Sequence, residues 1–100
     1  MATYVLLTKL SPESTKDLKA LDNLGREVAE KIRKDVPEVQ WKASYSVLGP
    51  YDYLDLFEAP NEEAAARVSV IIRTFGHATT ETWLATPYES FINMVKAMPG

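Results

Sequence analysis

The sequence predicts a single α+β domain with the element order βαββαβ, a four-stranded antiparallel sheet and an extra C-terminal helix. Three observations support this prediction. Short runs rich in β-branched and aromatic residues alternate with longer runs in which apolar residues recur every three or four positions. Proline, glycine and helix-capping residues separate these runs. A chain of 100 residues, 46% hydrophobic and 25% charged, has the composition of one globular domain over residues 1–100.

The first strand and the first helix are predicted in the first third of the chain. Residues 3–9 are rich in Tyr, Val, Leu and Thr and predict a strand. Ser-Pro-Glu at residues 11–13 is a helix-start signal, with proline at the first helical position. Poor helix formers within residues 22–25 leave a second interpretation open, in which residues 11–19 form only a short turn and the helix begins late. The apolar stripe of this helix, which runs to about residue 35, is Leu18, Leu21, Leu24, Val28 and Ile32.

A β-hairpin and a second helix are predicted next. Residues 40–47 alternate with the period of two that a strand requires, residues 48–50 supply a Leu-Gly-Pro turn, and residues 51–58 form the returning strand. Asn61, followed by two glutamates, predicts the N-terminus of the second helix, and Gly76 suits the position just past its end. The buried stripe of this helix is Ala64, Val68, Ile71 and Phe75.

The fourth strand and the last helix complete the predicted order. Residues 77–85 return as a strand. Thr-Pro-Tyr-Glu at residues 86–89 has the pattern of a capping box with proline at the first helical position. The apolar side of the last helix is Tyr88, Phe91, Ile92, Val95 and Met98.

This topology predicts a partner for the sheet. Right-handed crossovers place both connecting helices on one face and leave the other face bare. The first strand is apolar on both faces, with Tyr4 and Leu6 on one and Val5 and Leu7 on the other. Exposed apolar area is unfavourable by roughly 25 cal/mol per Å². We therefore expect a homodimer or higher homo-oligomer in which sheet packs on sheet, with the C-terminal helix as the competing cover.

Composition excludes several functional classes. The net charge is −3, and the Lys and Arg residues are scattered among acids, so we expect no nucleic-acid partner. No signal peptide and no membrane-length apolar segment is recognisable, which predicts a cytoplasmic protein with no membrane association. There is no cysteine, which excludes disulfides and thiolate chemistry within the sequence.

Several segments match a known family. They are Leu48-Gly49-Pro50-Tyr51-Asp52-Tyr53, the run from Phe57 to Ala66, and Gly76 with Thr80-Glu81-Thr82. The chain resembles the GYD-domain family, named for a Gly-x-Tyr-Asp core that here is Gly49, Tyr51 and Asp52. The resemblance implies a ferredoxin-like fold of the dimeric α/β-barrel type. That superfamily includes cofactor-independent monooxygenases, small-molecule isomerases and haem-handling proteins, so the resemblance fixes no reaction.

Alternation predicts which side chains line the interior of such a barrel. If Val47 faces Tyr51, the odd-numbered hairpin residues share one face, and on the last strand the bulky residues are also the odd ones. We assign both sets to the barrel interior. The competing interpretation is that these aromatic residues pack a dimer interface. The hairpin set is Trp41, Tyr45, Tyr51, Tyr53, Asp55 and Phe57, and the predicted ligand-binding residues are Tyr45, Tyr51, Tyr53, His77 and Trp83.

Four residues are candidates for proton transfer, namely His77, Glu81, Asp55 and Tyr51. His77 has the pKa range of a general base. It cannot share a metal ion with Glu81, because four strand residues separate the two by roughly 13 Å, so no metal site is predicted. A single histidine remains compatible with haem. Asp52 follows a Gly-Pro turn, where aspartate more often binds backbone amides than substrate.

The sequence therefore predicts a homodimeric small-molecule-binding or assembly module that needs no cofactor. The alternative is a cofactor-independent enzyme of the monooxygenase or isomerase type, acting on a small aromatic or apolar substrate in the barrel interior. A third and weaker hypothesis is a haem-associated protein with His77 as the axial ligand.

Overall fold

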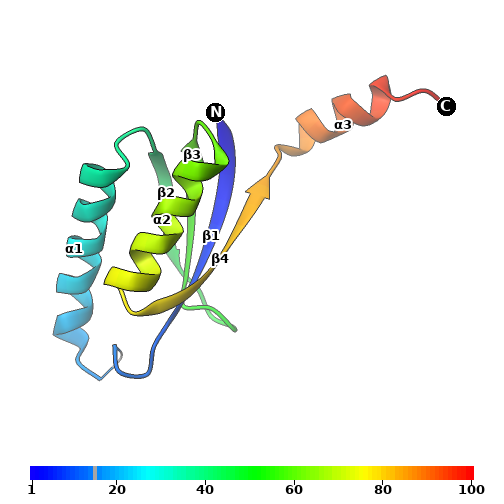
Figure 1. The fold of residues 1–100 in the computed structure, drawn as a ribbon. Coiled ribbons are helices and arrows are strands. Elements are labelled where there is room, and N and C mark those ends of the chain that lie inside the picture. Colours follow the sequence, from blue (N-terminus) through cyan, green and yellow to red (C-terminus); the bar gives the residue numbers. More distant parts are fainter. Residues whose placement is uncertain (15) are drawn as a thin grey trace.

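The computed structural model describes residues 1–14 and 16–100 and has the predicted order of elements (Figure 1). The four strands form one sheet in the order β2-β3-β1-β4, and each neighbouring pair is antiparallel. This is the ferredoxin-like arrangement, so the predicted fold is confirmed. The elements are β1 (Ala2–Leu10), α1 (Leu18–Asp35), β2 (Gln40–Ser46), β3 (Tyr53–Ala59), α2 (Glu62–Phe75), β4 (Ala78–Ala85) and α3 (Tyr88–Ala97).

Helix α1 begins late, as the second interpretation of the sequence held. Its N-cap is Asp17, whose carboxylate accepts hydrogen bonds from the amides of Lys19 and Ala20 at 3.0 and 3.4 Å. The Ser-Pro-Glu segment forms a turn closed by the Ser14 amide on the Ser11 carbonyl at 3.1 Å. Thr15, within the predicted turn, lies outside the described residues.

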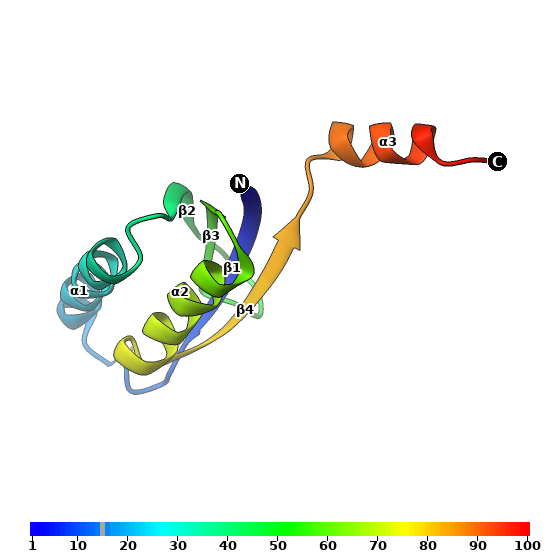
Figure 2. The ribbon, with the colours of Figure 1, turned by 45° about the horizontal axis from the view of Figure 1, so that its top comes forward.

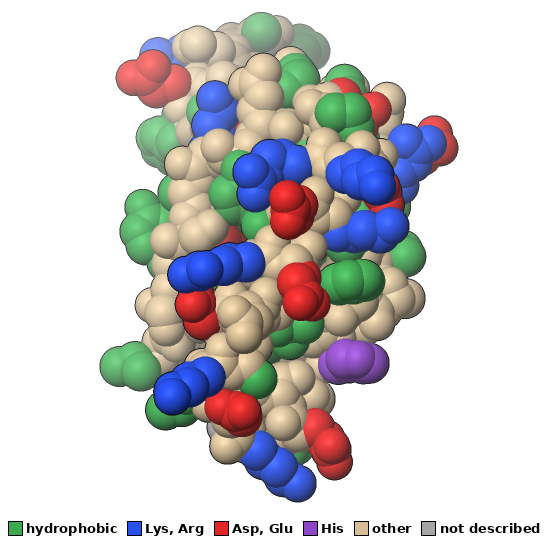
Figure 3. All heavy atoms as spheres, turned by 90° about the vertical axis from the view of Figure 1, so that its left-hand side faces the viewer, with side chains coloured by type: hydrophobic (Ala, Val, Ile, Leu, Met, Phe, Trp, Pro, Cys, Tyr) green, Lys and Arg blue, Asp and Glu red, His purple; other side chains and the backbone are tan. Residues whose placement is uncertain are grey.

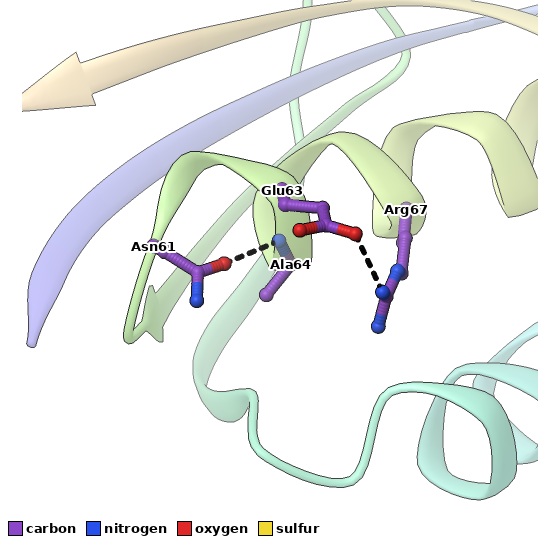
Figure 4. Close-up of polar contacts among 4 residues, drawn as sticks. All are labelled: Asn61, Glu63, Ala64 and Arg67. Carbon is purple, nitrogen blue, oxygen red and sulfur yellow. Dashed lines mark hydrogen bonds and ion pairs between the residues drawn. The ribbon is translucent and has the colours of Figure 1, made fainter.

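Helix α2 has both of its predicted ends. Asn61 accepts a hydrogen bond from the Ala64 amide at 2.8 Å, and Arg67 pairs with Glu63 one turn earlier at 2.7 Å (Figure 4). Gly76 is the C-cap, with its amide on the Ile72 carbonyl. The left-handed conformation common after a helix end is taken by the next residue, His77, at φ 51°.

The core lies between the two crossover helices and one face of the sheet. Phe57 of β3 and Leu6 of β1 are fully buried in it, together with Val68 of α2. Phe57 is also the centre of an aromatic stack, with ring centroids 5.6 Å from Tyr4 and 5.3 Å from Trp41. We call this side of the sheet the helix face.

The opposite side, which we call the open face, is not covered by α1 or α2 (Figures 1 and 2). Directly opposed residues of an antiparallel pair point to the same side, so the strand registers define two rows across this face. Seven of the eight residues are apolar, as was predicted for β1. The first row is Ala43, Leu56, Val5 and Trp83, and the second is Tyr45, Leu54, Leu7 and Glu81.

A β-bulge in β2 contradicts the predicted common face of the hairpin. Trp41 pairs with Phe57 on the helix face, but the register shifts between Trp41 and Ala43, so that Tyr45 points to the open face. Tyr53, Asp55 and Phe57 all lie on the helix face, because they pair with Thr8, Leu6 and Tyr4. The assignment of Trp41, Tyr53, Asp55 and Phe57 to the side away from the helices was therefore wrong, whereas that of Glu81 and Trp83 agrees with the register.

Helix α3 extends away from the rest of the chain (Figures 1 and 2). None of its residues is buried, and it does not cover the open face of its own chain. The predicted capping box is absent, because Pro87 occupies the N-cap position without a side-chain hydrogen bond. Within the part of the chain that the structure describes, no helix combines the length and the hydropathy that a membrane span requires.

Candidate functional site

The Gly-x-Tyr-Asp segment fastens the β2–β3 turn to the end of β1. Gly49 has φ 137°, a conformation that side chains disfavour. Asp52 accepts a hydrogen bond from the Leu10 amide at 2.8 Å, and its own amide donates to the Thr8 carbonyl at 2.9 Å. The prediction that Asp52 binds a backbone amide is confirmed, and its role in the fold is structural.

A polar cluster lies at the edge of the open face. The Tyr51 hydroxyl donates to one carboxylate oxygen of Glu81, and the indole nitrogen of Trp83 donates to the other at 3.1 Å. Because β1 lies between β3 and β4, Tyr51 reaches Glu81 by crossing β1, in which Leu7 is the register partner of Glu81. Two donors therefore fix the position of this carboxylate, although the residue itself is exposed.

The other predicted ligand-binding residues do not all join this cluster. Tyr45 shares the open face with Trp83, and the two are 56% and 51% exposed. His77 is exposed ahead of the first residue of β4, outside the paired strands. Tyr53 lies on the helix face, so the five predicted residues do not form one site.

A cleft with a volume of about 690 Å³ lies on the helix face, between α1 and the strands. Asp55 is half-buried in its floor, and this burial raises the pKa of its carboxyl, an effect that hydrogen bonding by Ser44 and Trp41 only partly offsets. Sequence reasoning missed this site because it placed Asp55 on the other side of the sheet. A lone acid between Leu54 and Leu56, in a strand apolar on both faces, was the available signal.

The outer surface on the α1 side carries charges of both signs, with Lys and Arg side chains interspersed with Asp and Glu (Figure 3). Arg26 pairs with Asp22 at 3.0 Å and Lys31 with Asp35 at 2.7 Å, each one turn apart on α1. No large field of a single sign develops on this face. Such pairs contribute little to stability because both partners are largely solvated.

The architecture and strand order place the chain among ferredoxin-like α+β domains, and solved structures share this fold. The Mycobacterium tuberculosis leucine response regulatory protein LrpA superposes with a TM-score of 0.57 at 18% identity, over 86% of this chain and 51% of that one. The chain thus spans about half of that regulator. The protein TTHA0845 from Thermus thermophilus matches with a TM-score of 0.57 at 26% identity, over 87% of this chain and 95% of the other. The structure of FFRP-DM1 matches with a TM-score of 0.55 at 26% identity, over 86% of this chain and 100% of the other.

Residues 4–95 match the GYD domain, and the chain belongs to this family. The resemblance seen in the sequence is therefore confirmed. A relative from Thermus thermophilus is 29% identical over 96 residues, which is 96% of this chain and 100% of that protein. The relative is named a glutamine synthetase and cystathionine beta-lyase binding protein.

Proposed function

We propose that this protein is a homodimeric binding and assembly module, in which the open faces of two copies pack against each other to form a dimeric α/β barrel. The observation that carries the proposal is the apolar character of a face that no element of the same chain covers. Tyr45 and Trp83, at its two edges, each expose about half of their surface. Monomers rarely leave large contiguous apolar patches in water.

The two rows of the open face suit an isologous contact. Their centre is aliphatic, with Val5, Leu54 and Leu56 partly exposed and Leu7 already buried, and their edges carry the aromatic rings. A two-fold axis through such a patch brings the same residues of both copies together. Burial of this area stabilises a complex by roughly 25 cal/mol per Å², before the entropy of association is subtracted.

Helix α3 supports the same proposal. Its apolar side chains are exposed, including Phe91, Met94 and Val95, and it points away from its own core. A second copy bound to the open face would provide a surface on which this helix could pack. We infer that α3 packs on the second subunit and extends the interface beyond the sheet.

Binding of other proteins is the second part of the proposal. The relative that spans nearly all of this chain is named for binding two enzymes. In the proposed dimer, α1 and α2 form the outer surface, which leaves their solvent sides free for such partners. Purified glutamine synthetase and cystathionine beta-lyase from the same organism, mixed with the protein, test this part: co-elution in size-exclusion chromatography supports it, and separate elution of both contradicts it.

Sedimentation velocity at micromolar concentration tests the dimer itself. We expect wild-type protein to sediment as a dimer or higher oligomer, and Leu56→Asp, in the centre of the open face, to shift it to monomer. Val70→Asp is the matched control, because Val70 is an exposed apolar residue of α2 outside the open face. A monomeric wild type, or equal effects of the two substitutions, would refute the homodimer.

Only two of the four candidates for proton transfer come together in one chain. Tyr51 and Glu81 are hydrogen-bonded on the open face, Asp55 lies on the helix face, and His77 is exposed outside the strands. This separation favours binding over catalysis as the proposal. Haem ligation by His77 stays a prediction from the sequence.

A further inference from the structure

The cleft between α1 and the sheet has the dimensions of a ligand site. Its volume of about 690 Å³ falls within the roughly 300–1,000 Å³ of small-molecule pockets, which are mostly apolar with a few polar groups. Apolar side chains of α1 form one wall, and the helix face of the strands forms the floor. The lining includes Leu21, Leu24, Val28, Trp41, Tyr53 and Asp55.

The α1 wall of the cleft is apolar even where α1 extends past the hydrophobic core. Ile32 is buried against the sheet, whereas Leu21 and Leu24, about three and two turns earlier on the same stripe, are only partly covered. Gly25 stands between these leucines and Val28, and a Cβ atom there would meet no atom within 4 Å. The N-terminal half of α1 therefore presents an apolar surface with space in front of it.

The floor supplies aromatic rings and one hydrogen-bond acceptor. Trp41 and Tyr53 line it, and the Trp41 indole nitrogen donates to the Ser44 hydroxyl at 2.8 Å. Ser44 is the register partner of Asp55, so the carboxylate stands at the end of this short polar chain. Rings of this kind bind a flat apolar body, and a carboxylate accepts a strong hydrogen bond from a hydroxyl.

The lining carries one charge of each sign, Asp55 in the floor and the exposed Arg33 on the α1 wall, so it has no net charge. Asp55 repels a carboxylate or phosphate, and Arg33 offsets the attraction of Asp55 for an ammonium group. An uncharged head group that donates one hydrogen bond suits Asp55 without needing a counter-ion. We propose that this cleft binds an uncharged aromatic alcohol, with its ring against Trp41 and Tyr53 and its hydroxyl donating to Asp55. The cleft and the open face lie on opposite sides of the sheet, so this site goes beyond the dimer and each proposal fails separately.

The indole N–H signals of the two tryptophans provide a site-resolved test by NMR, since Trp41 lines the cleft and Trp83 lies on the open face. Titration with 4-ethylphenol should shift the Trp41 signal and leave that of Trp83 in place, with at least tenfold tighter binding than 2-phenylethylamine or 3-phenylpropionate. A shift confined to Trp83, no shift at all, or tighter binding of either ion would overturn the proposal. So would tighter binding of L-phenylalanine, whose zwitterionic head would match Arg33 and Asp55 together.

Two substitutions separate recognition from folding. Asp55→Leu removes the acceptor, and Gly25→Leu fills the cleft from the opposite wall without touching Asp55. Each should weaken binding of 4-ethylphenol at least tenfold. Val70→Leu, at an exposed position of α2 that does not line the cleft, is the matched control and should leave the affinity unchanged. Retained affinity in Gly25→Leu, whose fold the far-UV circular dichroism spectrum checks, would contradict this location of the site.

Discussion

At the scale of single residues, Asp52 shows how a family motif can serve the fold rather than chemistry. Its carboxylate accepts the Leu10 amide and so ties the hairpin turn to the end of β1. The resemblance to a family marked this residue as important, and the position after a Gly-Pro turn indicated the backbone as its partner. The structure agrees with that simpler interpretation.

Loss of this carboxylate should destabilise the protein. We expect Asp52→Ala to lower the free energy of unfolding by about 1–3 kcal/mol, because the partly buried Leu10 amide loses its charged acceptor. Asp22→Ala is the control, since it removes only the exposed pair with Arg26 and should change stability by no more than about 0.5 kcal/mol. Urea denaturation at one protein concentration measures both. Equal values for the two variants would contradict the structural role.

Asp55 should make stability depend on pH. Because its pKa is raised in the folded protein, the folded state binds more protons than the unfolded state between the ordinary aspartate pKa of 3.8 and the raised value. The contribution of Asp55 to stability is therefore lost as the pH rises through this window. Asp55→Asn should be more stable than wild type at pH 7, and the difference should shrink below pH 3.8. Thermal unfolding across this range checks the sign, and a gain that grows on acidification would contradict it.

At the scale of elements, two glycines associated with helices should respond in opposite ways to substitution. Gly25 lies inside α1 with open space at its Cβ position, whereas a Cβ on Gly76 would stand 2.7 Å from the Ile72 carbonyl oxygen. Gly25→Ala should raise the free energy of unfolding by about 0.5–1 kcal/mol through helix propensity. Gly76→Ala should lower it by about 1–3 kcal/mol through the clash. Chemical denaturation of both variants measures these changes. If both substitutions change the free energy of unfolding in the same direction, the prediction is wrong.

Most element boundaries could be predicted because they depend on local chemistry. Asn61 and Gly76 mark the ends of α2 by capping rules that need no tertiary information. The start of α1 was left open, because poor helix formers within residues 22–25 weakened the Ser-Pro-Glu signal; in the structure the N-cap is Asp17, which the sequence analysis did not single out. The segment that begins at Thr86 has the residue types of a capping box, but the N-cap of α3 is Pro87 and no side-chain hydrogen bond caps the helix.

The side of the sheet that each hairpin residue takes could not be predicted in this way. Alternation along residues 40–47 implies a regular strand, and the bulge after Trp41 breaks that regularity. Because β2 contains one extra residue after Trp41, Trp41 and Tyr45 point to opposite sides of the sheet. The same extra residue shifts the pairing along β2, so that Ser44 stands opposite Asp55. A bulge depends on pairing with the adjacent strand, so the sequence of one strand does not reveal it. The candidate cleft was missed for a separate reason: the odd residues of the returning strand, Asp55 among them, were assigned to the side away from the helices, whereas the pairing of Asp55 with Leu6 places it on the helix face.

At the scale of the whole molecule, α3 should contribute directly to assembly. Phe91 exposes a large apolar side chain on a helix that has no cover of its own. Phe91→Asp should weaken self-association about tenfold or more, since burial of one such side chain contributes about 1.5–3 kcal/mol. Glu89→Gln on the same helix is the control. Sedimentation equilibrium measures both, and an unchanged dissociation constant for Phe91→Asp would remove α3 from the interface.

The whole-molecule features that the sequence predicted are those set by topology. Two crossover helices on one face and an apolar β1 on both faces imply an uncovered side, and the structure has one. Whether α3 would cover that side within the chain was left open, because the direction in which β4 ends depends on the twist of the sheet. The structure directs α3 outward.

An outward α3 also has a consequence for the chain before it meets a partner. Helices shorter than about 12–15 residues are marginal in water, and α3 has 10 residues and no side-chain cap. The helical content of α3 should therefore depend on the concentration of the protein itself. A dilution series followed by far-UV circular dichroism should show the helical signal decreasing as the oligomers dissociate. The helical content of the C-terminal segment would then measure self-association and would not be a fixed property of the subunit.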